Sequence, residues 1–151
     1  MNRSEKAIFT NMCMVYDGQG NILVQNRINK DWPGLTFPGG HVEKEESFTE
    51  SVKREVLEET GLVVKNLQLC GIKQFQTKDD ARYVVLCYKT NHYSGLLSSS
   101  AEGEVFWIPQ SNLLNYELAN DFEKMIEVFL DENISEFYYQ KTPDKWKSLL
   151  Y

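Results

Sequence analysis

The sequence predicts a single domain of mixed helices and strands, of the α/β or α+β class. The chain has 151 residues, a usual length for one domain with one core. Apolar, β-branched and aromatic residues gather in short runs separated by turn residues, which is typical of strands. Two longer segments place apolar residues at helical spacing, and helices and strands follow each other in mixed order.

The composition is that of an ordinary globular protein, with 42% hydrophobic and 25% charged residues. The net charge of −6 argues against a nucleic-acid polymer or an anionic membrane as partner. A polyanionic small molecule would need local positive charge or a metal ion to offset this field. No apolar run approaches the length of a membrane span, and the N-terminus lacks a cleavage pattern, so we expect a cytoplasmic protein.

The cysteines Cys13, Cys70 and Cys87 are far apart and lie in strand-like apolar stretches. Neither a disulfide framework nor a zinc site has this spacing. We therefore expect buried free thiols in a reducing compartment.

The predicted strands span residues 7–16, 22–27, 36–37, 62–77, 83–89 and 104–108. The run at 83–89 reads YVVLCYK and is the best candidate for a central strand. Cys70-Gly71 marks a bulge or bend. The serine-rich segment at 90–103 predicts a loop, and the aromatic tail at 134–151 predicts an edge hairpin.

The predicted helices span residues 47–60 and 121–130, with one further helical turn at 110–115. Ser47 or Glu46 can cap the first helix, and Gly61 is well placed to stop it. Asn120 is a good N-cap for the second helix, whose apolar residues recur at helical spacing.

Three glutamates of the first helix, Glu55, Glu58 and Glu59, are spaced at i, i+3 and i+4. At about 100° per residue, this spacing gathers their carboxylates on one side. They border the apolar stripe of Val52 and Val56, whereas carboxylates that only keep a helix soluble would lie opposite it. Hard divalent cations such as Mg²⁺ and Mn²⁺ prefer oxygen ligands. Helix geometry alone leaves a metal site and an acidic solvated face as equal alternatives.

The stretch from residue 40 to residue 62 resembles the signature of the Nudix hydrolases. That signature runs Gly, five residues, Glu, seven residues, Arg-Glu, an aliphatic residue, any residue, Glu-Glu, any residue, Gly and an aliphatic residue. Its fixed positions are matched by Gly40, Glu46, Arg54, Glu55, Val56, Glu58, Glu59, Gly61 and Leu62. The resemblance implies the Nudix fold, a mixed β-sheet sandwiched between α-helices (α/β/α).

The resemblance also implies a reaction and a cofactor. Nudix enzymes hydrolyse a nucleoside diphosphate linked to another group, with Mg²⁺ or Mn²⁺. By resemblance, Glu55, Glu58 and Glu59 bind the metal, and Glu55 is a candidate to orient or deprotonate the attacking water. The backbone carbonyl of Gly39 or Gly40 is a further candidate ligand, and these glycines let the backbone approach a substrate closely.

Two more sets of polar residues are candidates near this motif. Arg54 is expected to hold a carboxylate through a bidentate pair, with Glu46 as its partner. Glu46 is equally suited to be a plain surface acid or a cap. The family often supplies one more acid from a loop before a late strand, where Glu102 and Glu104 lie in this chain. We favour Glu102 as a metal ligand, and a solvated loop acid is the alternative for either residue.

Candidate substrate-binding residues surround the motif. Arg27 ends a strand and His41 follows the double glycine, so either could meet a phosphate; an exposed arginine and a structural histidine are the alternatives. Trp32 and Phe37 flank the loop that would border a nucleobase, either stacking on it or packing the core. Asn120 can read a base edge, because its amide offers a donor and an acceptor, or it can cap the helix.

Residues 32–43 and 118–122 look like segments of MutT-type 8-oxo-dGTP diphosphatases. The leading hypothesis is hydrolysis of an (oxidised) purine nucleoside triphosphate, such as 8-oxo-dGTP, to the monophosphate and pyrophosphate, as in nucleotide pool sanitisation. The same chemistry on ADP-ribose, a dinucleotide polyphosphate or another diphosphate-linked metabolite is the first alternative. A non-catalytic nucleotide-binding module is the second. Both a monomer and a homodimer remain open.

Overall fold

A computed structural model describes residues 1–151. Its strands are β1 (Lys6–Val15), β2 (Asn21–Arg27), β3 (Gly34–Thr36), β4 (Val63–Lys65), β5 (Gln68–Gln76), β6 (Ala81–Thr90), β7 (His92–Ser94), β8 (Gly103–Pro109), β9 (Glu136–Lys141) and β10 (Trp146–Leu150). Its helices are α1 (Phe48–Thr60), α2 (Phe122–Leu130) and the 3-10 helix η1 (Gln110–Asn115).

A mixed five-stranded sheet forms the middle of the molecule, with the strand order β1-β6-β5-β9-β10. Strand β6 runs parallel to β1 and antiparallel to β5, so it is an internal strand, as its apolar sequence predicts. A second sheet has the order β3-β2-β8, and β4 pairs with β7 in a short ribbon. Strand β7 lies in the segment predicted as a loop, whereas β4 lies in the segment predicted as a strand.

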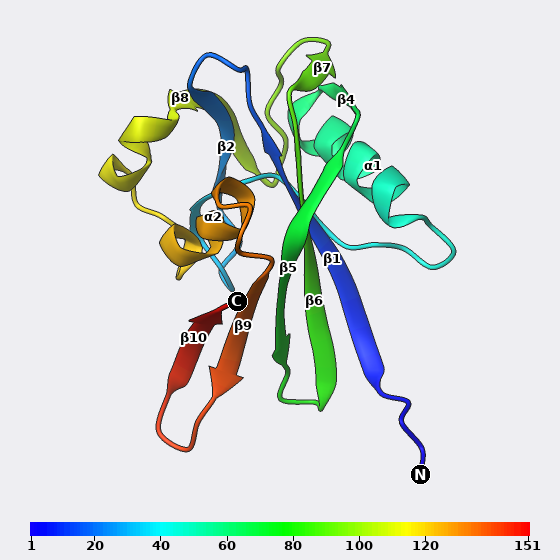
Figure 1. Ribbon diagram of the computed structural model, residues 1–151. Coiled ribbons are helices and arrows are strands. Elements are labelled where there is room, and N and C mark those ends of the chain that lie inside the picture. The colour runs from blue at the N-terminus through cyan, green and yellow to red at the C-terminus, as the bar shows by residue number, and fades with distance from the viewer.

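Alternating side chains of β1 and β6 supply two separate cores. Met12 and Met14 of β1 belong to the core that contains the buried residues of α2. Cys13 and Val15 belong to the core beneath α1. Because successive residues of a strand face opposite sides, the two helices cover opposite faces of the sheet (Figure 1). The predicted α/β/α arrangement is thereby confirmed.

The aromatic tail folds back onto the main sheet as the predicted hairpin. Strand β9 pairs with β10 in antiparallel fashion and runs parallel to β5, from Ile72 opposite Glu136 to Gln74 opposite Tyr138. The register of β5 against β6 shifts between Leu69 and Gly71, which confirms the predicted irregularity at that point. The hairpin therefore continues the sheet beyond β5 (Figure 1).

The two helices begin differently from each other. The Ser47 hydroxyl caps α1 by accepting a hydrogen bond from the Glu50 amide at 3.0 Å, so Ser47, not Glu46, is the cap. Helix α2 begins one residue later than predicted, at Phe122. Its N-cap position is Asp121, which has a left-handed backbone (φ 63°) and makes no side-chain cap bond. The prediction that Asn120 caps α2 is therefore wrong.

All three cysteines are free thiols, of which Cys13 and Cys87 are buried and Cys70 is half-buried. Burial raises the pKa of Cys13 and of Cys87 above the usual thiol range. No helix has both the length and the apolar character needed to cross a membrane.

A substitution of Phe129 in α2 tests the packing of the core on the α2 face of the sheet. Its ring is 1% exposed and meets the Phe37 ring edge-on at 5.0 Å. We expect Phe129→Ala to lower the free energy of unfolding by about 3–5 kcal/mol, because it removes a fully packed ring. Urea denaturation followed by circular dichroism measures this change. The neighbouring Leu130→Ala is the control and should cost about 1 kcal/mol or less, since Leu130 is 39% exposed; equal costs at both positions would contradict this packing.

Candidate functional site

Helix α1 fixes the candidate acids through its buried stripe. Val52 and Val56 are both fully buried in the core beneath the helix. This anchoring places Glu59 inside the protein, at 4% exposure, and leaves the Glu58 side chain 58% exposed. The Glu55 side chain, at 14% exposure, lies between these extremes. The three predicted metal ligands therefore differ in their access to solvent.

The loop at Gly39 and Gly40 lies between β1 and α1. The Asn11 amide donates to the Gly40 carbonyl at 2.8 Å, which ties the loop to β1. A Cβ at Gly39 would lie 2.1 Å from the Asn11 carbonyl oxygen, and one at Gly40 would lie 2.3 Å from the Glu55 carboxyl carbon. The Gly39 contact is with backbone, so only glycine fits there, whereas a Cβ at Gly40 would have to displace the end of the Glu55 side chain.

The loop also receives the most buried acid of α1. The Gly39 amide donates to a Glu59 carboxylate oxygen at 2.9 Å. Burial of Glu59 nevertheless raises the pKa of this carboxyl to about 7. The Gly39 carbonyl accepts no hydrogen bond from the protein. A buried acid and a free carbonyl oxygen thus meet at one loop residue.

Arg54 binds the acids of the motif together. Its guanidinium pairs with both oxygens of Glu46, at 2.7 and 3.0 Å, which confirms the predicted bidentate contact. The same group reaches Glu55 at 2.8 Å, Glu58 at 3.4 Å and the His41 carbonyl at 2.9 Å. Hydrogen bonds from Arg54 lower the pKa of Glu46 to about 2. Burial raises the pKa of Glu55, against the opposing effect of Arg54.

These elements border a cavity of about 940 Å³. The predicted site residues that line it are Arg27, Phe37, Gly39, Gly40, His41, Glu55, Glu59, Glu102 and Asn120. Of the two loop acids, Glu102 lines the cavity, whereas Glu104 is exposed on β8 opposite Asn26 of β2. Glu58 lies outside the cavity lining. The cavity thus joins the motif to the loop before β8.

The structure shows the burial and the neighbours of two predicted substrate-binding residues, Arg27 and Phe37. The buried Nε of Arg27 has no partner in the protein. Phe37 lies beneath the cavity and is 0% exposed, with its ring edge-on to those of Phe122 and Phe129. A ring enclosed in this way has no face for a nucleobase, so the substrate-binding role predicted for Phe37 is corrected to core packing. Trp32, which is half-buried, also lines the cavity.

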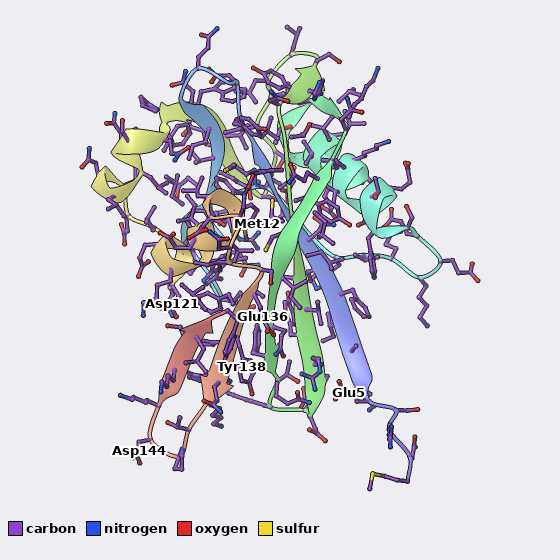
Figure 2. All side chains as sticks on the ribbon, in the orientation of Figure 1. Glu5, Met12, Asp121, Glu136, Tyr138 and Asp144 are labelled. Atoms are coloured by element: carbon purple, nitrogen blue, oxygen red, sulfur yellow. The ribbon has the colours of Figure 1, made fainter.

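Several lining residues lie outside the predicted set. Asn11 connects the elements of the site, because its amide donates to the Ser51 hydroxyl at 2.9 Å and accepts from the Gly40 amide at 3.2 Å. Its position as a polar residue inside the apolar run of β1 was the available signal. Others are Lys73, Phe75, Asp121, Tyr139 and Trp146. Figure 2 shows Asp121 at the start of α2, beside the β9–β10 hairpin.

The side chains do not form an assembled metal site as they stand. No group of three or more His, Cys, Asp or Glu side chains converges closely enough to hold a metal ion. Arg54 holds Glu55 and Glu58, and the Gly39 amide holds Glu59. These contacts occupy carboxylate oxygens of Glu55, Glu58 and Glu59, so the convergence of the three acids on a metal ion stays a prediction.

The donor set nevertheless suits a hard divalent cation. Glu55, Glu59 and Glu102 bring three carboxylates to one cavity, beside the free Gly39 carbonyl. Buried carboxylates are costly unless a cation accompanies them. Oxygen-only ligands of this kind are those that Mg²⁺ and Mn²⁺ prefer.

Comparison with known families and proteins gives consistent matches. A family model described as the NUDIX domain matches residues 9–129. The uncharacterized Nudix hydrolase YvcI of Bacillus subtilis is 34% identical over 103 residues, which are 65% of this chain and 64% of that protein. An ADP-ribose pyrophosphatase of Methanocaldococcus jannaschii is 30% identical over 119 residues, which are 77% of this chain and 69% of that protein.

Solved structures share the fold. A MutT protein from Bacillus halodurans superposes with a TM-score of 0.76 and 27% identity, covering 95% of this chain and 97% of its own. The NUDIX domain of Shewanella oneidensis NrtR, solved with ADP ribose, has a TM-score of 0.67 and 21% identity, covering 87% of this chain and 90% of its own.

The pKa of Glu59 predicts how stability depends on pH without divalent cations. In the folded protein this pKa is raised from its usual 4.5 to about 7, so the folded state binds more protons than the unfolded state between these values. The contribution of Glu59 to the free energy of unfolding is therefore fully present below the unfolded-state pKa. It is lost as the pH rises through the folded-state pKa. Glu59→Gln keeps an acceptor for Gly39 and should remove about 2–3 kcal/mol of this fall.

Urea denaturation in EDTA, at about pH 5 and about pH 8, measures this difference. Glu50→Gln on the exposed side of α1 is the control and should keep the wild-type profile. Parallel pH profiles for the wild type and Glu59→Gln would contradict the buried state of Glu59.

Proposed function

The chain belongs to the Nudix family, and from this premise we propose that it is a divalent-metal-dependent pyrophosphohydrolase acting on a nucleoside di- or triphosphate-type substrate. One observation carries this proposal. The Gly39–Gly40 loop and helix α1 bring Glu55 and Glu59 to the wall of a substrate-sized cavity, and Glu102 faces the same space.

The chain supplies the groups that such a reaction needs. Mg²⁺ or Mn²⁺ would be held by Glu55, Glu58, Glu59 and Glu102 with the Gly39 carbonyl, and when bound it supplies positive charge to the phosphate oxygens. Glu58 makes only a long contact to Arg54, at 3.4 Å, and lies at the solvent edge of the helix. Turning toward the cavity would therefore cost this side chain little.

Arg54 and Glu46 keep the reacting groups in place. Their bidentate pair anchors the guanidinium on one side, so its remaining N–H donors orient Glu55. Glu55 would orient the attacking water and take its proton, and its raised pKa brings it closer to neutral pH, where a general base is most effective. The guanidinium of Arg27, which lines the cavity, would donate to a substrate phosphate oxygen, with His41 nearby on the cavity wall.

The leading substrate is an (oxidised) purine nucleoside triphosphate such as 8-oxo-dGTP, cleaved to the monophosphate and pyrophosphate. Asn120 supports this choice, because it does not cap α2 and is an exposed residue of the cavity wall. Its amide lies beside the Tyr139 hydroxyl and offers a base edge both a donor and an acceptor. The MutT protein of Bacillus halodurans, which matches almost the whole chain, supports the same choice. Such an enzyme would work on the cytoplasmic nucleotide pool, as a monomer or a homodimer.

ADP-ribose is the second candidate. The relative from Methanocaldococcus jannaschii is an ADP-ribose pyrophosphatase, and the NrtR domain was solved with ADP ribose. The cavity, at about 940 Å³, is near the upper end of small-molecule sites and has room for a substrate with two bulky ends. A dinucleotide polyphosphate would need similar room.

The metal role of Glu58 can be tested by substitution. We expect Glu58→Gln to lower kcat by more than about tenfold with Mg²⁺, because the amide no longer offers a charged oxygen ligand. A pyrophosphate-release assay measures this loss. Glu50→Gln is the matched control, since Glu50 lies on the same helix and contacts only Lys53. A loss of less than about tenfold in Glu58→Gln would count against the metal role.

The substrate class can be decided by a panel. We expect 8-oxo-dGTP to be turned over with a higher kcat/KM than ADP-ribose or a dinucleotide polyphosphate, and Asn120→Ala to lower that preference by about tenfold. Equal turnover of ADP-ribose would displace the leading substrate. Thermal stabilisation by nucleotide without any turnover would indicate a non-catalytic module.

A further inference from the structure

Lys73 of β5 lies in a cage of aromatic rings on the cavity wall. Its ammonium nitrogen is 5.1 Å from the centre of the Trp32 ring, 5.8 Å from Phe75, 5.4 Å from Phe137 and 5.9 Å from Tyr139. Each ring is close enough for a cation–π interaction. Phe75 shares β5 with Lys73, whereas Trp32 and the β9 pair Phe137 and Tyr139 are distant in sequence, so the cage exists only in the folded protein.

The rings stabilise the positive charge of Lys73, but they offer no hydrogen-bond acceptor for its N–H groups. Lys73 forms no ion pair, and no oxygen of the protein accepts a hydrogen bond from it. Burial lowers its pKa, against the opposing charge of Asp121. A partly desolvated ammonium group with free donors is suited to a ligand that brings its own acceptor.

The C-terminal hairpin completes this wall. The rings of Tyr139 and Trp146 are stacked at 4.8 Å and 5°. Phe75 meets both edge-on, and its other neighbour, Tyr83, stacks on it at 5.0 Å. These rings form a continuous apolar surface against which a planar group can lie. The hairpin lies outside residues 9–129, which are those the family model matches.

Asp121 provides an acceptor in the same cavity. Its carboxylate forms no ion pair and caps no helix, and its polar neighbour is the Tyr139 hydroxyl, whose pKa is raised by burial and by this carboxylate. Its left-handed backbone, at φ 63°, is uncommon for a residue other than glycine and marks a constrained position. The Trp32 indole donates to the Asn120 carbonyl at 2.9 Å, which ties one wall of the cage to the start of α2. A donor and an acceptor therefore face one cavity.

We propose that Lys73 determines base specificity, by donating to a ring carbonyl of the nucleobase while Asp121 accepts from the neighbouring ring N–H. The group recognised is a lactam edge, in which a C=O and an N–H are adjacent on a planar ring lying against the hairpin aromatics. This inference rests on the proposed function, because the nucleotide must enter the same cavity with its phosphates at Glu55 and Glu59.

The proposed pair discriminates by charge and by hydrogen bonding. An amino edge, as in adenine, presents a donor where Lys73 also donates and an unprotonated ring nitrogen where Asp121 needs a proton donor. Both contacts would then be unsatisfied in a partly desolvated site, which is the arrangement that gives strong rejection. A lactam edge satisfies both.

The test compares IMP with AMP, which differ only at this edge. Binding to the full chain is measured by calorimetry in EDTA, so that no turnover is required. We expect the wild type to bind IMP at least about tenfold more tightly than AMP. Lys73→Met keeps the length and apolar stem of the side chain and should bring this ratio close to one, whereas Lys65→Met, at an exposed position of β4, should leave it unchanged.

Asp121→Asn is the second variant, because asparagine tolerates the left-handed backbone and should fold. It should lower the same ratio through loss of the charged acceptor. Equal affinities for IMP and AMP in the wild type, or an unchanged ratio in a folded Lys73→Met, would overturn the proposal. Turnover without this discrimination would reject the role of Lys73 alone. Discrimination without turnover of any nucleotide would reject the proposed reaction alone.

Discussion

The site depends on the close contact between the Gly39–Gly40 loop and helix α1. A Cβ at Gly39 would clash with the Asn11 carbonyl, and one at Gly40 would displace the Glu55 carboxylate. The contact places the Gly39 amide on Glu59 and brings the His41 carbonyl to Arg54. If the loop moved away by the width of a methyl group, both hydrogen bonds would be lost. The carboxylates of α1 would then have no fixed relation to the substrate.

Charge balance at this contact explains why Arg54 is surrounded by acids. The guanidinium compensates Glu46, Glu55 and Glu58, whereas Glu59 is left with a single backbone donor. Burial of that acid raises its pKa against the opposing charge of Arg27, and this is the electrostatic cost of keeping an anionic ligand ready inside the protein. Arg54 therefore holds the site in place. The negative charge of Glu59 is not fully balanced by the protein, so a cation would fit beside it.

Local patterns in the sequence predicted the elements that depend on neighbouring residues. Helix α1, its end before Gly61 and the pairing of Arg54 with Glu46 all follow from spacing within about two turns of helix. Asn120 failed as a cap because the chain makes an additional turn at Asp121, which residue type does not reveal. Phe37 could not be assigned because stacking and core packing use the same ring. Lys73 had no signal at all, since its cage joins β5 to Trp32 and to the tail.

The parallel pairing of β9 with β5 also changes which strand forms the border of the main sheet. Without the hairpin, the nine residues of β5 would offer a long row of unpaired peptide groups. With it, the border on this side of the sheet is β10, which has five residues and carries Lys147. A short, charged border strand is a poor template for joining a second chain. The same segment that shapes the cavity wall thus also covers the middle of β5, from Ile72 to Gln74, where an added strand would otherwise pair.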